Sequence, residues 1–126
     1  MIKEIVIGML LSEKSYNNPL GKCWDVIIDR PLGSTHPTFK ETIYPINYGY
    51  IPGIIAGDGE EQDAYVVGIS YPISAIHGKC IAIVHRKNDN EDKWIIAPLN
   101  MIITKQEIQD SIYFQEQYFD IEMEYL

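Results

Sequence analysis

Short segments in which apolar, β-branched or aromatic residues alternate with polar ones recur between residues 24 and 97. Gly, Pro, Asn and Asp residues, which form turns, separate these segments. Such a pattern predicts β-strands. The expected strands are Trp24–Asp29, Ile43–Tyr50, Ala64–Ile69, Lys79–His85 and Trp94–Ala97. Short strands at this spacing favour a small β-barrel.

One helix is predicted after the strands. Thr104 and Glu107 have the spacing of a capping box, in which each side chain accepts a hydrogen bond from the other residue's backbone N–H. Ile108, Ile112 and Phe119 then share one side. We expect this helix to continue to about residue 118 and to pack on the sheet, which makes the fold class α+β.

The composition is that of an ordinary globular protein, with 46% hydrophobic and 22% charged residues in 126 positions. This length predicts a single domain, 1–126, in which residues 1–20 form an N-terminal appendage. No apolar run is long enough to span a membrane or to act as a signal sequence, and two isolated cysteines fit a reducing cytoplasm. We therefore expect a cytoplasmic protein without a membrane partner.

The net charge of −8 disfavours nucleic acid as a partner. An acidic protein still binds an anionic ligand when its carboxylates first collect divalent cations. Asp58, Glu60, Glu61 and Asp63 crowd into six residues between two expected strands. Because carboxylates this close repel one another, either water solvates them on an open turn or cations neutralise them. Both interpretations are open from the residues alone.

A second acidic group lies in the next long connection. It consists of Asp89, Glu91 and Asp92, and it is bracketed by Arg86, Lys87 and Lys93. Carboxylates on loops at strand ends suit Mg²⁺, which keeps water ligands and completes its shell with phosphate oxygens. The neighbouring lysine and arginine side chains would then contact the phosphate directly.

Tyr44–Pro52, followed closely by Asp58–Asp63, resembles the signature of the soluble, barrel-fold inorganic pyrophosphatases of family I. Ile28–Ser34 resembles the acid-bearing strand end and loop of that family, and Phe114–Tyr118 resembles its C-terminal helix motif. The resemblance covers about residues 25 to 120. It implies a five-stranded barrel like those that bind oligonucleotides, with flanking helices, and Mg²⁺-dependent hydrolysis of pyrophosphate to two phosphates.

The family's site implies several Mg²⁺ ions and a water that the metals activate. The corresponding metal-binding residues are Asp29, Asp58, Glu60, Asp63, Asp89 and Asp92. Glu60 would accept the proton of the attacking water, and Asp63 is the second catalytic carboxylate. The expected contacts to the pyrophosphate or phosphate ligand come from Tyr48, Lys93, Tyr118, Arg30, Lys40 and Arg86. The family's prokaryotic members are commonly hexamers, so we expect a homo-oligomer.

Three departures from the family pattern keep an alternative open. Glu60 stands where the signature has Asp, Phe119 stands where a phosphate-binding lysine follows the helix tyrosine, and a hairpin is reduced to Pro37–Glu41. In that segment Lys40 and Glu41 are the suggested counterparts of a lysine and a glutamate of the family. The alternative is a metal- and phosphate-binding protein with weak or altered phosphoanhydride hydrolase activity.

Some residues near the motifs also have a structural interpretation. Tyr44, Tyr48 and Tyr50 are aromatic residues that pack in a sheet or line a pocket. His36 competes with Arg30 for the position of the family arginine. Two acids that lie beside the expected metal ligands, Glu61 and Glu91, are expected to face solvent. An acidic C-terminal tail is also expected to be solvated: Glu116, Asp120, Glu122 and Glu124.

Overall fold

The computed structural model describes residues 18–126, so most of the expected N-terminal appendage lies outside the described residues. The elements in chain order are β1 (Cys23–Arg30), β2 (Asn47–Ile55), β3 (Glu61–Val66), β4 (Ala75–Arg86), β5 (Asp92–Ala97), α2 (Lys105–Glu116) and β6 (Ile121–Tyr125). All five expected strands and the helix are present, and their bounds differ by a few residues. β6 was not expected. The assignment of the chain to one domain stays a prediction.

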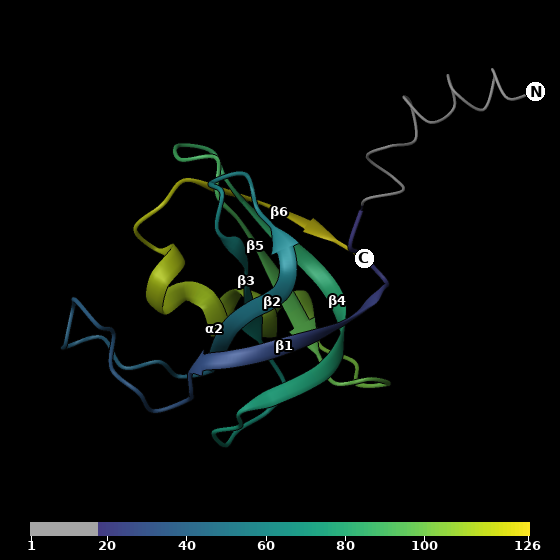
Figure 1. The fold of residues 1–126 in the computed structure, drawn as a ribbon, viewed down its shortest axis with the longest axis horizontal. Coiled ribbons are helices and arrows are strands. Elements are labelled where there is room, and N and C mark those ends of the chain that lie inside the picture. The colour runs from purple at the N-terminus through teal and green to yellow at the C-terminus, as the bar shows by residue number, and fades with distance from the viewer. Residues whose placement is uncertain (1–17) are drawn as a thin grey trace, which may run out of the picture.

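The first five strands close into a barrel. Their order is β1-β2-β3-β5-β4, and the pairing of β1 with the first half of β4 completes the ring. All neighbours are antiparallel except β3 and β5, which are parallel. Figure 1 shows this barrel with α2 against its outer side. The α+β barrel predicted from the strand spacing is confirmed.

Two groups of buried side chains lie on opposite faces of the strands. The first, with Val26, Ile51, Val66, Ile83 and Ile96 among its members, draws on all five barrel strands and fills the interior. The second includes side chains of α2 and covers the outer face of β2 to β5: Tyr44, Tyr48, Tyr65, Val84, Ile95, Ile108 and Ile112. Alternation along each strand produces this division, because successive side chains point to opposite faces. The expected packing of the helix on the sheet is confirmed.

The start of α2 is determined locally, as its capping box predicts. Thr104 Oγ1 accepts a hydrogen bond from the Glu107 backbone N–H at 3.1 Å, and Glu107 Oε1 accepts one from the Thr104 N–H at 2.9 Å. The helix ends at Glu116, two residues before the expected end, and the chain then turns. Phe119, which we expected on the same side of the helix as Ile108 and Ile112, therefore lies outside the helix. No helix within residues 18–126 has the length and apolar character needed to cross a membrane.

The acidic C-terminal segment forms strand β6. β6 pairs antiparallel with the second half of β4, with Ile121 opposite Arg86 and Tyr125 opposite Ala82. Ile121, Met123 and Tyr125 pack against the outer core, while the intervening glutamates lie on the other face. Of the tail residues expected to face solvent, Asp120 and Glu122 are exposed, whereas Glu124 is only partly exposed.

The connection between β1 and β2 (residues 31–46) folds into a projecting hairpin beside α2 (Figure 1). Thr35 pairs with Ile43, and the His36 backbone N–H donates to the Thr42 carbonyl at 2.9 Å. At its base, buried Asn47 Oδ1 accepts the backbone N–H of Leu32 at 2.9 Å. The expected strand from residue 43 thus begins only at residue 47, because the preceding residues belong to this hairpin.

Gly49 of β2 lies directly against the backbone of β1, where it pairs with Ile28. A Cβ atom added there would lie 1.8 Å from the Ile27 carbonyl oxygen, so the two strands would have to separate. We expect Gly49→Ala to lower the free energy of unfolding by about 3 kcal/mol, measured by urea denaturation. The control is Gly57→Ala, whose Cβ would be 3.6 Å from its nearest neighbour. Equal stability of the two variants would contradict this account.

Candidate active site

A cleft of about 1010 Å³ lies between the projecting hairpin, the outer face of the barrel and the C-terminal end of α2. Four cationic and three acidic side chains line it: Arg30, Lys40, Arg86 and Lys93, and Glu41, Asp63 and Glu91. Tyr48 and Tyr118 also line it. The structure therefore brings together all six side chains that we expected to contact phosphate, in a chain whose net charge is −8.

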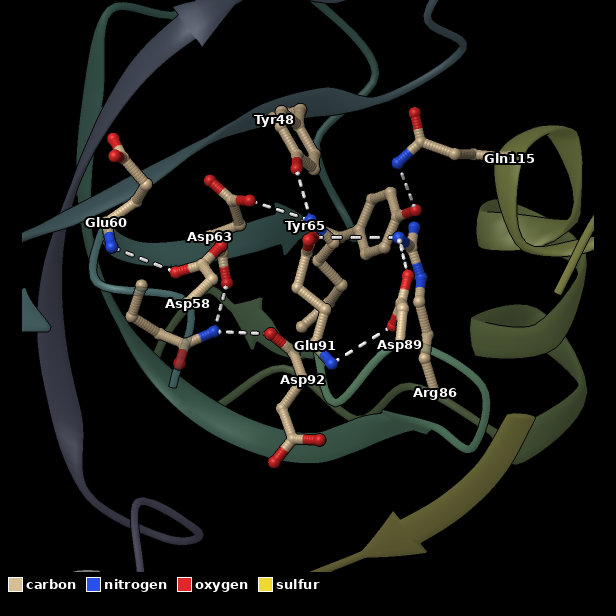
Figure 2. Close-up of polar contacts among 12 residues, drawn as sticks. Tyr48, Asp58, Glu60, Asp63, Tyr65, Arg86, Asp89, Glu91, Asp92 and Gln115 are labelled. Atoms are coloured by element: carbon tan, nitrogen blue, oxygen red, sulfur yellow. Dashed lines mark hydrogen bonds and ion pairs between the residues drawn. The ribbon is translucent and has the colours of Figure 1, made fainter. Parts of the chain in front are cut away.

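Lys93 lines the cleft, and its ammonium group donates three hydrogen bonds. It donates to Asp63 Oδ2 at 2.7 Å, Glu91 Oε1 at 2.5 Å and Tyr48 Oη at 3.0 Å. Tyr48 comes from β2, Asp63 from β3 and Lys93 from β5, and Figure 2 shows the labelled partners converging on one point. The Lys93 side chain is only 4% exposed, so these three acceptors replace its water shell.

The protonation states in this group follow from burial and charge. Burial alone would lower the pKa of Lys93, but the Tyr48 hydroxyl and the Asp63 carboxylate outweigh it and raise the pKa above its ordinary value. Burial raises the pKa of Tyr48 far above its ordinary value, although neighbouring Lys93 lowers it. Lys93 therefore stays a cation at neutral pH, and Tyr48 keeps its proton.

Arg86, at the end of β4, is the second buried cation. Its Nε and Nη2 donate to the two carboxylate oxygens of Glu116 at 3.0 and 2.7 Å. Its Nη1 lies 3.5 Å from Asp89 Oδ2 and 3.6 Å from Glu91 Oε1. Glu116, which we expected in the solvated tail, is 3% exposed, so that expectation was wrong. The spacing of Glu116 four residues after Ile112 marks it as a member of the buried helix face.

A chain of hydrogen bonds joins Arg30 to this pair across the cleft wall. Arg30 Nη1 donates to Tyr44 Oη at 2.5 Å, and that hydroxyl donates to Gln115 Oε1 at 3.3 Å. Gln115 Nε2 donates to Tyr65 Oη at 2.7 Å, and Tyr65 donates to Glu116 at 2.5 Å. Sequence reasoning missed Gln115 and Tyr65, because no local pattern connects positions 50 residues apart.

A family model described as inorganic pyrophosphatase matches residues 27–120. The chain belongs to the inorganic pyrophosphatase family. The inorganic pyrophosphatase of Xylella fastidiosa is 30% identical over 66 residues, which are 48% of this chain and 36% of that protein. That of Sulfolobus acidocaldarius is 40% identical over 57 residues, 43% of this chain and 33% of that protein. The match thus spans about a third of the length of these curated relatives.

Solved pyrophosphatase structures share the fold. The inorganic pyrophosphatase of Ehrlichia chaffeensis superposes with a TM-score of 0.65 and 19% identity, over 84% of this chain and 87% of that chain. The inorganic pyrophosphatase of Neisseria gonorrhoeae superposes with a TM-score of 0.62 and 19% identity, over 82% of this chain and 80% of that chain. The barrel predicted from the resemblance to this pyrophosphatase family is therefore confirmed.

The metal-binding acids expected of a pyrophosphatase do not all reach the cleft. Asp58 and Glu60 lie on an exposed turn, where Asp58 Oδ1 accepts the Glu60 backbone N–H at 2.9 Å. Asp89 Oδ1 similarly accepts the Glu91 N–H at 3.0 Å. Asp29 is largely exposed. Its partial burial raises its pKa, the proximity of Asp63 adds to this, and Arg30 opposes it.

Strand register decides between the acids around Lys93. Glu91 and Lys93 are two residues apart and face the cleft together, whereas Asp92 points to the opposite side, as Figure 2 shows. The expectation that Glu91 faces solvent was wrong, and Asp92 bonds His85 instead of lining the cleft. Among residues 18–126 no three His, Cys, Asp or Glu side chains are grouped to hold an ion. Of the six expected metal ligands, only Asp63 therefore lines the cleft in this part of the chain.

The residues present do fit one divalent cation. Asp63 and Glu91 direct carboxylate oxygens to a common point, and Mg²⁺ is bound in proteins by one or two carboxylates together with waters and phosphate oxygens. The two carboxylates are partly exposed, at 33% for Asp63 and 27% for Glu91.

Phe119 occupies the position where the family pattern has a lysine. The guanidinium carbon of Arg86 lies 3.6 Å from the centre of its ring, which is a close cation–π contact. Phe119 therefore positions Arg86, and Arg86 supplies the positive charge at this point of the cleft wall.

His85 links three strands on the face of the sheet opposite Lys93. Its Nδ1 lies 3.0 Å from Asp92 Oδ1 and its Nε2 lies 2.8 Å from Glu124 Oε1. Burial lowers the pKa of His85, but the hydrogen bonds to Glu124 and Asp92 outweigh it, so the folded-state pKa lies above 6.5. The protonated ring donates to both carboxylates and joins β4 to β5 and β6.

A raised histidine pKa stabilises the fold at low pH. The contribution is fully present below the unfolded pKa of about 6.5 and is lost as the pH rises through the higher folded pKa. We expect the difference in free energy of unfolding between the wild type and His85→Gln to shrink as the pH rises above about 6.5 and passes through the higher folded pKa. Urea denaturation across this range measures it. Glu124→Gln should reduce the same pH dependence, and parallel wild-type and His85→Gln profiles would contradict the assignment.

Proposed function

We propose that the chain hydrolyses inorganic pyrophosphate to two phosphate ions, with Mg²⁺ as the required divalent cation. The observation that carries this proposal is the cleft itself, where four of the chain's ten basic residues surround the carboxylates of Asp63 and Glu91. A cationic pocket in an acidic protein suits a compact polyanion, and the carboxylates suit its accompanying metal ion. Membership of the pyrophosphatase family supports the same substrate.

Asp63 and Glu91 would hold the cation. When bound, Mg²⁺ would supply charge neutralisation of the phosphoryl oxygens and lower the pKa of water so that it attacks phosphorus near neutral pH. Of the two expected catalytic carboxylates, Asp63 lies in the cleft, and we assign to it the acceptance of the water proton. Glu60 lies on the exposed turn.

The remaining cleft side chains would bind and orient the substrate. Arg30, Lys40 and Lys93 would neutralise phosphoryl oxygens from three sides, and Arg86 would act from its fixed place between Glu116 and Phe119. The protonated hydroxyl of Tyr48, and that of exposed Tyr118 at the mouth, would donate hydrogen bonds. We further propose that the protein acts in the cytoplasm as a homo-oligomer.

The phosphate released from pyrophosphate by the purified protein tests this function. We expect release in the presence of Mg²⁺ and its loss when a chelator removes the metal, because the phosphoryl charges are then unshielded. Return of activity on adding Mg²⁺ again is the control for damage by the chelator. Release that continues unchanged in the presence of chelator would contradict the metal requirement.

One group of observations favours a second function, a metal- and phosphate-binding protein with weak or altered phosphoanhydride hydrolysis. Five of the six expected metal ligands lie outside the cleft lining, and the carboxylates of three of them, Asp58, Asp89 and Asp92, contact a close sequence neighbour or His85. Calorimetric binding of Mg-pyrophosphate without phosphate release would support this function in place of the first.

A further inference from the structure

The Lys93 ammonium lies at the point where a divalent cation would have to bind. Its nitrogen is 2.7 Å from Asp63 Oδ2 and 2.5 Å from Glu91 Oε1, and its third hydrogen bond goes to Tyr48. Mg²⁺ and Mn²⁺ bound to carboxylates need oxygen ligands at similar or shorter distances. One space between the same two carboxylates cannot hold both the ammonium and a metal ion.

The ammonium also removes part of the attraction for a metal. A single positive charge in direct contact with two carboxylates leaves the trio with one net negative charge. Arg86 Nη1, 3.6 Å from Glu91 Oε1, reduces the field further. A metal ion that arrives alone must therefore displace Lys93 without offering the buried ammonium another acceptor, and an unpaired buried charge is costly.

A phosphoanhydride removes this obstacle, because its oxygens accept hydrogen bonds from an ammonium group. Lys93 has a flexible four-carbon stem, and both its nitrogen and Tyr48 face the cleft. Arg86 is held by two bonds to Glu116, and Arg30 is bonded to Tyr44, so neither of these cations contacts both Asp63 and Glu91. Lys93 is the cation placed to exchange carboxylate oxygens for phosphate oxygens.

We infer that Lys93 is a resident cation that couples metal binding to substrate binding. In the absence of a phosphoanhydride it occupies the carboxylate pair and keeps divalent ions weakly bound. When the phosphoanhydride arrives, its oxygens take over the ammonium, and Asp63 and Glu91 become free for the metal ion. This inference rests on the proposed function, since it assumes that a metal-bound phosphoanhydride is the ligand of the cleft.

The affinity of the wild-type chain for Mn²⁺, measured by calorimetry with and without methylenediphosphonate, tests the coupling. This analogue has a P–C–P bridge that water does not cleave. We expect Mn²⁺ to bind about tenfold more tightly in the presence of the analogue, and the analogue to gain the same factor from Mn²⁺ because coupling between two ligands is reciprocal. The measurement does not depend on turnover.

Lys93→Met removes the charge and keeps an apolar stem of similar length. This variant should bind Mn²⁺ alone about tenfold more tightly than the wild type and lose most of the coupling. The matched control is Lys87→Met, which removes a charge from an exposed lysine in the connection between β4 and β5 and should leave both affinities unchanged. Circular dichroism establishes whether the variants are folded. If Lys93→Met does not fold, Tyr48→Phe replaces it, because this change removes one acceptor of Lys93. Tyr48→Phe should raise the affinity for Mn²⁺ alone by a smaller factor than Lys93→Met.

The outcomes separate this inference from the proposed function. If wild-type chain binds Mn²⁺ equally well with and without the analogue, or if Lys93→Met binds Mn²⁺ alone no more tightly than wild type, the resident-cation role is overturned and the hydrolase proposal stands. If the wild type binds neither Mn²⁺ nor the analogue in any combination, the proposed function fails as well. Coupling that is present in the wild type and in Lys87→Met, and lost in Lys93→Met, supports the inference.

Discussion

Phosphate release from pyrophosphate is expected to fall at least about 100-fold in Asp63→Asn, because this is the scale of losing a proton acceptor in the reaction. The substitution keeps the shape of the side chain and removes its charge. It takes from the cleft a carboxylate that lies 2.7 Å from Lys93 Nζ and that we assign both to the cation and to the water proton. The initial rate of phosphate release at saturating Mg²⁺ and pyrophosphate measures the loss.

Asp110→Asn is the matched control for this variant. Asp110 lies on the exposed side of α2, where its carboxylate accepts a hydrogen bond from Gln106, so the same chemical change should leave the rate within about twofold. Thermal unfolding of both variants separates a lost function from a lost fold. An Asp63→Asn protein that is folded and has the wild-type rate would exclude Asp63 from the reaction.

Glu116→Gln is expected to lower the free energy of unfolding by about 3–5 kcal/mol, the usual cost of leaving one partner of a buried ion pair without its countercharge. Glu116 accepts two hydrogen bonds from Arg86 and one from Tyr65, and both charged side chains are almost fully buried. Urea denaturation at neutral pH measures the change.

Two further variants test the origin of this loss. Arg86→Met combined with Glu116→Gln removes both charges, so the double variant should recover a large part of the stability that either single change removes. Glu122→Gln makes the same chemical change at an exposed position of β6 and should alter stability by less than about 0.5 kcal/mol. A Glu116→Gln protein as stable as Glu122→Gln would show that the pair contributes little to the fold.

The local elements were predictable because their signals lie within a few residues of one another. The alternation in Trp24–Asp29 and the Thr104–Glu107 capping box each occupy one strand or one helical turn, and the structure confirms both. The end of α2 and the start of β2 were less accurate. Long-range packing decides both positions, because the chain turns after Glu116 to place β6 beside β4, and residues before Asn47 fold back as the projecting hairpin.

The site was predictable in its components and less so in its arrangement. Tyr48, Asp63, Lys93 and Arg86 were all expected near the ligand, and the structure places all four in one cleft. The choice between Glu91 and Asp92 depended on strand register, since a shift of one residue moves a side chain to the other face of the sheet. Buried Glu116 was missed because its partner Arg86 lies 30 residues away in the sequence.

The sequence by itself determined that residues 24 to 97 form short strands, that a capped helix follows them, and that acids and bases lie at the strand ends. These properties depend on side-chain chemistry and on spacing within a few residues. Only the tertiary structure decided that β6 completes the sheet, that Glu91 faces the cleft and that the Lys93 ammonium lies between two carboxylates. The physical reason is that these contacts join distant segments, and their geometry is set by barrel closure and strand register, which no local pattern of residues specifies.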